Sequence, residues 1–521
     1  MNASTFEQFT RLATAAAPVT SRIPATTGNG DDGTRIVPVW RDSLFDADTP
    51  VSAFAKLRRE PFGFLLESAA AGGETWSRYT FLGSKPRAAW RYKEGIVEDW
   101  STSNGWHNPR TPADPLADLD SIISTPRPVD VPELGAFWTG AVGFFGYDIV
   151  RLIERLPNRK AVRADVPDAL FVLTGSMVII DNLRAQARVV VSVIVSPAEN
   201  ADVLRQKYDS AIRDIDEIEA GLAEPSRLGS LTLDSAAEPA SGRSNMDRDT
   251  FMQRVERIRE YIRAGDCFQA LLSRRIDLRA DFSGGGLYRA LRALNPSPYM
   301  YHLVLDGLEL VGSSPELLVR LENNRVTLRP IAGTRRRGKT PEEDAALADE
   351  LLADPKERAE HIMLVDLGRN DVGRVAKYGT VNVTDLMVVE KYSHVSHIVS
   401  QVEGEIAGKL SAMDVFRATF PAGTMTGAPK VRAMEIIDEL EDESRGPYAG
   451  AVGYIAGGGR RMDLAITIRT CVIAEGVASI QAGAGIVADS VAAAEWDETQ
   501  SKAGALLAAI GQLRASIQGT A

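Results

Sequence analysis

The sequence is poor in cysteine and histidine, with only two and five of these residues among 521. Cys267 and Cys471 are too few for a disulfide framework or a thiolate zinc site, and they fit a reducing compartment. No apolar run is long enough to span a membrane, and the first twenty residues lack the basic start and apolar core of a secretory signal. We therefore expect a soluble cytoplasmic protein without a membrane partner.

Positive charge is also in short supply, since 59 lysines and arginines face 70 aspartates and glutamates, for a formal net charge of −11. Nucleic acids and anionic membranes bind basic surfaces, so this balance argues against a nucleic-acid partner. An anionic small molecule would need a local group of positive side chains. The composition is otherwise that of an ordinary globular protein, with 44% hydrophobic and 25% charged residues.

The length of the chain exceeds the usual size of a single core, which predicts two lobes or one large assembly. Residues 1–35 are expected to form a loosely ordered N-terminal segment, and short β-prone stretches fill an N-terminal subdomain over 36–223. Residues 224–245 are rich in Pro, Ser, Ala and Gly and predict a linker or exposed loop, and 246–515 form the second part. Strands come in runs, which favours an α+β fold with antiparallel sheets.

Some local elements can be placed from their end signals. The segment Asp354–Glu357 (DPKE) predicts a helix start, with an N-cap, a proline at the first position and a capping glutamate. Asn323-Asn324 predicts a hairpin turn, and Met300–Val311 is expected to be a strand. A long final helix is expected from Val491 to about Leu513.

Two short acidic words in the C-terminal half, ERAEH and EWDET, each hold two glutamates three residues apart: Glu357 with Glu360, and Glu495 with Glu498. On a helix both carboxylates of a pair lie on one face and repel each other. Two such helices facing one cavity would suit Mg²⁺, which prefers hard oxygen ligands. Either pair alone is more often a solvated face, because Glu357 fits a helix cap and Glu498 can pair with Lys502.

Short sequence motifs spread from about Phe62 to Ala503 favour a functional role for these glutamates. They include FLLES, YIRAGDCFQALLSRR, NPSPYMYHL, GSSPELLVR, RPIAGTRRRG, KERAEHIMLVDLGRNDVGRV, SHVSHIVS, FPAGTMTGAPKVRAMEII, GPYAGAVGYI and QAGAGIV. With these words in this order, the chain resembles the chorismate-utilising enzymes, and most of all the large synthase subunit (component I) of anthranilate synthases. The resemblance implies an α+β fold with large antiparallel sheets enclosing the active site and helices outside. It makes 246–515 the chorismate-binding catalytic domain.

The resemblance also implies a reaction and a site. Ammonia would add to chorismate next to its ring carboxylate, and loss of pyruvate would give anthranilate, the first step of tryptophan biosynthesis. Glu360 and Glu498 match the magnesium ligands, Glu357 and Glu495 stand beside them in catalytic support, and His397 matches a histidine placed for proton transfer. The other catalytic positions are Thr426 and Gln269, and the substrate-binding positions are Gly333, Thr334, Tyr448, Arg469, Gly483, Ala484, Gly485 and Lys502.

Two positions separate the sister reactions of the family. Relatives that use water carry a lysine where this chain has Gln269, and relatives that make aminodeoxychorismate carry a nucleophilic lysine where it has Ala332. Both differences favour anthranilate. The alternatives are a sister chorismate enzyme (aminodeoxychorismate or amino-deoxyisochorismate synthase) and a non-catalytic tryptophan-sensing protein.

Neither cysteine lies in a glycine elbow of the kind that activates a nucleophile, so the ammonia is expected from a separate glutamine amidotransferase subunit in a hetero-oligomer. The resemblance implies a second pocket, for L-tryptophan as feedback inhibitor. Because this pocket joins both parts of the chain, its occupancy would shift an open–closed equilibrium. Its residues would be Glu67, Ser68, Pro298, Tyr299, Met300, Val452, Gly453 and Tyr454.

Overall fold

The computed structural model describes residues 3–15, 33–68, 78–157, 160, 166–226, 228–391 and 395–518, and within these residues the strands form two large sheets. Every strand pairing is antiparallel except that of β1 with β7. The first sheet has thirteen strands, in the order β12 (Arg243–Ser244), β13 (Gln269–Arg279), β25 (Val477–Ile486), β24 (Thr470–Ala474), β15 (Leu308–Ser314), β14 (Tyr299–Leu305), β2 (Phe62–Glu67), β3 (Tyr79–Gly83), β10 (Ser176–Asp181), β11 (Gln186–Val195), β1 (Arg35–Leu44) and β7 (Arg127–Pro128), with β21 (Gly427–Ala428) paired to β13.

The second sheet has twelve strands in the described part of the chain. Their order is β18 (Ile331–Arg336), β20 (Val395–Glu405), β17 (Arg325–Leu328), β16 (Leu317–Glu322), β23 (Met462–Ile466), β22 (Ala451–Ala456), β8 (Gly140–Phe145), β9 (Ala169–Thr174), β4 (Pro86–Lys93), β5 (Ile96–Ser101) and β6 (Gly105–Arg110), with β19 (Asn382–Lys391) paired to β20. The predicted α+β fold with large antiparallel sheets is confirmed.

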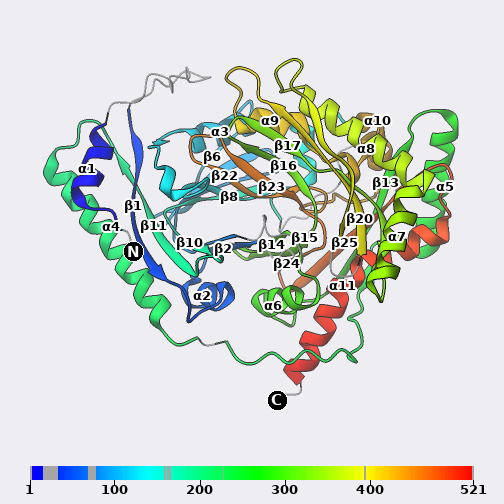
Figure 1. Ribbon diagram of the computed structural model, residues 1–521, viewed down its shortest axis with the longest axis horizontal. Coiled ribbons are helices and arrows are strands. Elements are labelled where there is room, and N and C mark those ends of the chain that lie inside the picture. The colour runs from blue at the N-terminus through cyan, green and yellow to red at the C-terminus, as the bar shows by residue number, and fades with distance from the viewer. Residues whose placement is uncertain are drawn as a thin grey trace.

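The helices lie outside the sheets (Figure 1). They are α1 (Phe6–Thr14), α2 (Pro50–Leu57), α3 (Pro115–Ser124), α4 (Ala201–Ala223), α5 (Arg248–Ala264), α6 (Gly284–Leu294), α7 (Pro341–Ala353), α8 (Pro355–Gly373), α9 (Ala412–Thr419), α10 (Lys430–Leu440) and α11 (Ala492–Gln518), with short 3-10 turns η2 (Pro132–Leu134), η3 (Tyr147–Leu152) and η4 (Gly423–Met425). None of the described helices is long and apolar enough to cross a membrane.

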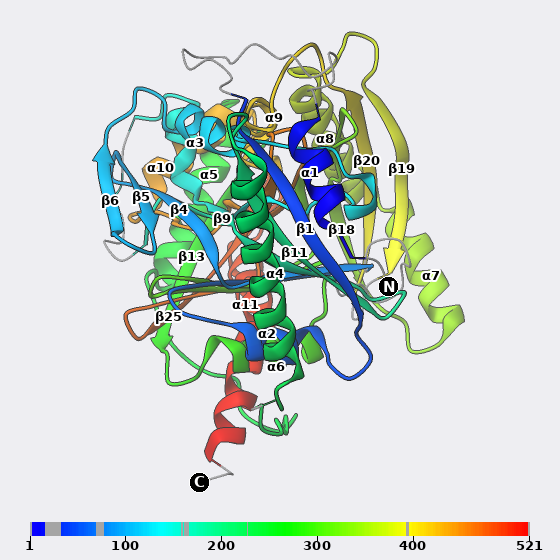
Figure 2. The same cartoon turned by 90° about the vertical axis from the view of Figure 1, so that its left-hand side faces the viewer.

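Hydrophobic side chains fill the space on both faces of each sheet. Between the sheets, Phe64 and Leu303 of the first pack with Phe144 and Val172 of the second. On the outer face of the first sheet, α2, α4, α6 and α11 bury a second cluster, and Figure 2 shows α4 lying across β1 and β11. On the outer face of the second sheet, α3, α8 and α9 bury a third. The order is therefore helices, sheet, sheet, helices, with apolar burial driving each contact.

Both sheets combine strands from the two sides of the predicted linker. In the first sheet β2 lies between β14 and β3, and in the second β22 lies beside β8. Part of the segment 224–245 runs along α11, where the N–H of Ala240 donates to the carbonyl of Leu507 at 2.9 Å. The division at 224–245 therefore separates two parts that share both sheets, and as a domain boundary it stays a prediction.

Most of the loosely ordered N-terminal segment that we expected lies outside the described residues. Its described residues, 3–15 and 33–35, include the helix α1 (Phe6–Thr14), and Phe9 of that helix is fully buried. The helix begins after Thr5, whose side chain accepts the N–H of Gln8 as an N-cap.

The predicted turn is confirmed at Asn323-Asn324, and the strand predicted over Met300–Val311 is wrong. The turn at Asn323-Asn324 joins β16 to β17, with both residues at positive φ. The single strand expected over Met300–Val311 is wrong, because β14 and β15 form a hairpin there. Asp306 and Gly307 make its turn at φ 53° and 86°, and an Asp-Gly pair is a common hairpin signal.

Candidate active site

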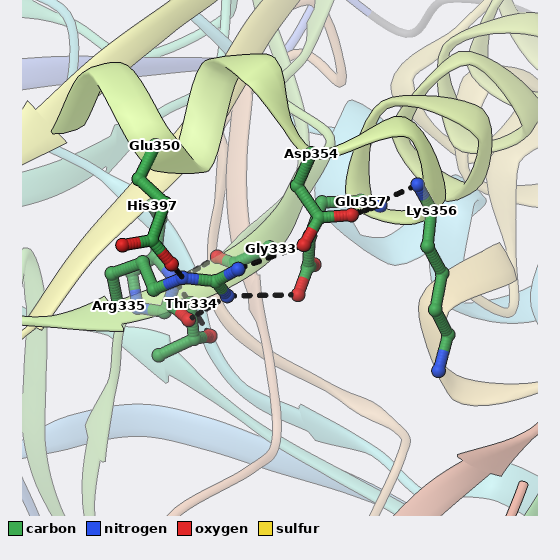
Figure 3. A network of polar contacts seen from close by, with 8 residues as sticks. All are labelled: Gly333, Thr334, Arg335, Glu350, Asp354, Lys356, Glu357 and His397. Atoms are coloured by element: carbon green, nitrogen blue, oxygen red, sulfur yellow. Dashed lines mark hydrogen bonds and ion pairs between the residues drawn. The ribbon is translucent and has the colours of Figure 1, made fainter. Parts of the chain in front are cut away.

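Helix α8 starts where the sequence predicts it, and Figure 3 shows its first turn beside β18. The side chain of Asp354 accepts the N–H groups of Lys356 and Glu357 at 2.9 and 3.3 Å. The reciprocal capping bond expected from Glu357 is wrong, because the N–H of Asp354 donates to Glu350. The Glu357 carboxylate instead accepts a hydrogen bond from Nη1 of Arg335 at 3.2 Å. Because both groups are charged, this bond is stronger than one between neutral groups.

The two acidic words lie close to each other, one at the start of α8 and one at the start of α11. Burial raises the pKa of Glu360, and the negative charges of Glu357 and Glu498 raise it further. Burial likewise raises the pKa of Glu495, with Glu498 adding to the effect. Glu498 pairs with Lys502 at 2.7 Å, as their spacing predicts. The charges of the two glutamate pairs therefore act on each other across the two helices.

This arrangement fits one particular way of binding a magnesium ion. Within the described residues no three His, Cys, Asp or Glu side chains are grouped closely enough to hold a metal alone. Mg²⁺ is commonly bound by one or two carboxylates, while substrate oxygens and water complete its shell. Glu360 and Glu498 fit this mode of binding, in which substrate and water complete the shell. A cation between them would relieve the repulsion by which Glu357 and Glu498 add to the raised pKa of Glu360.

His397 of β20 is held against β18 in a defined orientation (Figure 3). Its Nδ1 lies 2.8 Å from the carbonyl of Gly333 and 3.2 Å from the hydroxyl of Thr334. A carbonyl can only accept, so Nδ1 carries the proton in the neutral ring and Nε2 is the basic nitrogen. Burial lowers the pKa of His397, which keeps the ring neutral near pH 7.

Gly333 occupies a position that favours glycine. Its φ is 68°, and a Cβ there would lie 3.1 Å from the Glu357 carboxylate. This close approach places the PIAGT segment directly against α8. Gly333, Thr334, His397 and Glu357, all predicted site residues, therefore meet in one network.

Arg469 is the least compensated charge of the site. Within the described residues its guanidinium has no hydrogen bond or ion pair, and burial lowers its pKa. Its charge also lowers the pKa of His397, which places the two side chains near each other. The backbone of Arg469 has φ 48°, uncommon for a residue with a side chain, and its carbonyl accepts the N–H of Ser313 at 3.1 Å. A partly buried guanidinium with no partner among the described residues is suited to an anionic ligand.

The opposite wall is built by β13 and β25, whose register pairs Ala270 with Ile486. A Cβ on Gly485 would lie 2.3 Å from Nε2 of Gln269, and one on Gly483 would lie 2.9 Å from the hydroxyl of Tyr448. The carbonyl of Gly483 accepts from Lys502 at 3.0 Å. Small residues are thus required wherever this strand passes the site.

Two predicted site residues, Thr426 and Ala484, have side chains that are engaged elsewhere. The Thr426 hydroxyl donates to the carbonyls of Ala422 and Gly423, so its hydrogen goes to its own turn. The side chain of Ala484 is fully buried in a cluster with α5 and α10, on the face away from the site. Ala484 can therefore reach a ligand only through its backbone.

Glu316 is a candidate functional residue that sequence reasoning missed. It lies between β15 and β16 in the word GSSPELLVR, and burial raises its pKa to about 7. The Thr424 hydroxyl donates to its carboxylate at 2.8 Å, and the positive charge of Lys502 lowers its pKa in part. An acidic residue directly before Leu317-Leu318-Val319 was the available signal.

The predicted tryptophan-site residues line one cavity of about 580 Å³. It lies between the sheets and is lined by all eight of them: Glu67, Ser68, Pro298, Tyr299, Met300, Val452, Gly453 and Tyr454. Tyr454 stacks on Phe137 with ring centroids 4.1 Å apart. A flat aromatic wall suits an aromatic ligand.

The polar groups of this cavity differ in whether their oxygens already have hydrogen-bond partners. The carboxylate of Glu67 accepts from Arg292 at 2.7 and 2.8 Å and from Tyr288 at 2.8 Å, so it is already engaged. Ser68 Oγ and Asp463 Oδ1 are buried and have no hydrogen-bond partner among the described residues. The other Asp463 oxygen pairs with Arg320 at 2.7 Å. Sequence reasoning missed Arg320 and Asp463, because their pairing joins two distant strands.

Both cysteines are buried and unbonded. Burial raises the pKa of the Cys471 thiol to about 12 and also raises that of Cys267. A protonated thiol is a poor nucleophile. Neither cysteine therefore suits glutamine hydrolysis.

Comparison with known proteins agrees with this geometry. The anthranilate synthase component 1 of Aquifex aeolicus is 46% identical over 476 residues, which cover 91% of this chain and 94% of that protein. A crystal structure of anthranilate synthase component I from Streptococcus pneumoniae superposes with a TM-score of 0.71 at 35% identity, covering 89% of this chain and 99% of that one. The Escherichia coli isochorismate synthase MenF (TM-score 0.68, 19% identity, covering 97% and 98% of the two chains) shares the fold.

A sequence profile described as chorismate binding enzyme matches residues 71–508. This span includes all the residues of the candidate active site described above. The chain therefore belongs to the family of chorismate binding enzymes.

Proposed function

We propose that this chain converts chorismate and ammonia into anthranilate, pyruvate and water, with Mg²⁺ as cofactor. The observation that carries the proposal is the partly buried guanidinium of Arg469, which has no charged partner among the described residues and whose charge acts on His397. Chorismate is a dicarboxylate, so one carboxylate would pair with Arg469 and the other would lie near the metal ligands. The relatives, which are anthranilate synthase components, support the same reaction.

Each charge in the site then has a task in binding. Arg469 forms a bidentate pair with one carboxylate of the substrate. Glu360 and Glu498 would hold Mg²⁺, which when bound would supply positive charge for the other carboxylate. The backbone of Gly483 and Gly485 lines the ring, where no side chain keeps the substrate away.

Two residues are placed to move protons. Glu316 is protonated below about pH 7 and would give its proton to the ring hydroxyl, which leaves as water while ammonia adds next to the ring carboxylate. His397 is neutral and would accept, through Nε2, the proton lost from the aminated carbon as pyruvate departs. The positive charge of Lys502 lowers the pKa of Glu316 in part and would stabilise the carboxylate that the transfer leaves.

The sister reactions fit the site less well. Ala332 on β18 is next to Gly333, where it offers no nucleophile that could form a covalent intermediate. Gln269 lies against Gly485, and an amide is a poor base for activating water. Ammonia, which is itself a nucleophile, needs no such base.

The first test is the nitrogen source. With chorismate and Mg²⁺, the purified chain should form anthranilate from ammonium at mildly alkaline pH and none from glutamine, because its buried thiols cannot hydrolyse an amide. Anthranilate fluorescence and a pyruvate assay measure the products. Equal amounts of both are expected. An amino intermediate without pyruvate would indicate a sister enzyme, and no turnover at all would leave the tryptophan-sensing alternative.

The supply of ammonia in the cell would come from a glutamine amidotransferase subunit. The printed name "component 1" of the relatives supports a second component. Adding that subunit should make turnover glutamine-dependent, since the chain itself lacks a suitable nucleophile.

We further propose that the 580 Å³ cavity binds L-tryptophan as an inhibitor. Tyr454 and Phe137 would face the indole, while Ser68 and Asp463 have buried oxygens available for the ammonium group. The site is separate from the candidate active site, so inhibition would act through a change in conformation.

Ser68→Arg should abolish this inhibition. A cationic side chain in the cavity would repel the ammonium group and fill its site, raising the half-inhibitory concentration of tryptophan about a hundredfold, or ~2.7 kcal/mol. Inhibition is measured in the ammonium-dependent assay, and turnover without tryptophan should be unchanged. The matched control is Ser103→Arg, at an exposed turn outside the cavity. Retained inhibition in Ser68→Arg refutes the assignment.

A further inference from the structure

Arg445 lies behind the candidate active site, with its side chain 1% exposed. Its Nε and Nη2 donate to the two carboxylate oxygens of Glu441 at 2.8 and 2.7 Å. Glu441 also accepts the N–H and the hydroxyl of Ser273, both at 2.8 Å. The ion pair is therefore fully hydrogen-bonded and attached to β13.

The remaining N–H groups of Arg445 reach two main-chain carbonyls. Nη1 donates to Met425 at 2.8 Å, and Nη2 donates to Leu271 at 2.9 Å. The same two segments are joined a second time, because the N–H of Leu271 donates to the carbonyl of Thr426 at 2.8 Å. The guanidinium thus fixes the turn that contains Thr426 against β13.

The face of the guanidinium lies over two tyrosine rings. Its central carbon is 4.7 Å from the ring centroid of Tyr147 and 5.8 Å from that of Tyr448. Tyr448 is the residue whose hydroxyl lies beside Gly483. One buried side chain therefore contacts three segments that carry predicted site residues: Gln269 on β13, Thr426 in its turn, and Tyr448.

Stability alone does not account for this arrangement. Removing two charges from water offsets much of their attraction, so an apolar pair of the same volume can stabilise a fold equally well. An apolar pair cannot donate to two carbonyls in fixed directions. Without Arg445 the carbonyls of Met425 and Leu271 lose these bonds inside the protein.

We propose that Arg445 is a positioning residue for the amination of chorismate. It touches no substrate, and it holds Gln269, Thr426 and Tyr448 in register through Glu441 and the two carbonyls. The kinetic consequence rests on the proposed function, whereas the structural consequence does not. The two are therefore measured separately.

The kinetic test is Arg445→Lys, which keeps the charge but is too short and has too few donors for all four acceptors. In the ammonium-dependent assay kcat should fall about 10- to 100-fold, because small displacements of reacting groups are costly. The KM for chorismate should change less than about threefold, since Arg469 and the metal ligands still bind its charges. The control is Arg151→Met, which removes another guanidinium held by two carboxylates, Asp148 and Asp438. It should keep the wild-type kcat even if it lowers the melting temperature equally.

The structural test is amide hydrogen exchange, which needs no activity. In Arg445→Lys the amides of Leu271, Met425 and Thr426 should exchange faster, with peptides of β8 and β9 unchanged. If Arg445→Lys does not fold, Glu441→Gln serves the same test. It removes the negative charge that pairs with Arg445 and keeps an oxygen that can accept from Ser273. Unchanged local exchange, or a kcat loss matched by Arg151→Met, overturns the proposal. An inactive wild-type protein with the expected exchange pattern overturns only the proposed function.

Discussion

Replacing Glu360 with glutamine lowers kcat/KM for chorismate about a thousandfold at saturating ammonium, equivalent to ~4 kcal/mol of lost stabilisation. Glu360 is the more buried of the two proposed ligands, and burial, together with the negative charges of Glu357 and Glu498, raises its pKa. An amide leaves the shape of the site unchanged but removes the charge that would hold the ion. Glu498→Gln should act in the same direction.

The expected loss has a matched control and a second readout. Asp497→Asn changes the neighbouring, exposed carboxylate of α11 and should leave turnover within about twofold of wild type. Calorimetric titration with Mg²⁺ should show weaker binding in Glu360→Gln and unchanged binding in Asp497→Asn. Wild-type turnover in both Glu360→Gln and Glu498→Gln would remove the metal assignment.

Glu316→Gln should lower kcat about a hundredfold and remove one limb of the pH profile. Burial raises the pKa of Glu316 to about 7, so the carboxyl holds its proton below that pH and loses it above. If this proton goes to the leaving hydroxyl, wild-type kcat at a fixed concentration of free ammonia falls as the pH rises through about 7. The variant has no titrating group at this position and should show a flat response there.

The control for this prediction is a half-buried carboxylate whose pKa shifts in the opposite direction. Glu309 on β15 accepts a hydrogen bond from His302, which lowers its pKa against the effect of burial. It stays ionised throughout the range, so Glu309→Gln should keep the wild-type pH profile. The proton-donor role of Glu316 fails if Glu316→Gln retains the limb near pH 7.

The elements that could be predicted are those whose signals are local. Asp354 and Pro355 mark the start of α8, and Asn323-Asn324 marks a hairpin, because caps and tight turns depend on neighbouring residues. Asp306-Gly307 carries a local turn signal of the same kind. The apolar residues around it favoured a single strand instead.

Partners across the fold could not be predicted in this way. Nothing near Glu357 in the sequence indicates that Arg335 takes its carboxylate, and nothing near Glu67 indicates Arg292. The raised pKa of Glu316 depends on burial between strands that meet only in the folded chain. The resemblance named the residues of the site, and the tertiary structure supplied their charge states.

The sharing of both sheets between distant parts of the chain has a consequence for synthesis on the ribosome. Strand β2 needs β14 as a neighbour, and the paired residues Glu67 and Met300 are 233 positions apart. At about 5–20 residues per second, the edge of β2 waits roughly 10 to 50 seconds for its partner. During that interval an apolar strand edge is open to other nascent chains. We therefore expect the yield of folded protein to rise when the first half is protected until the second half has emerged.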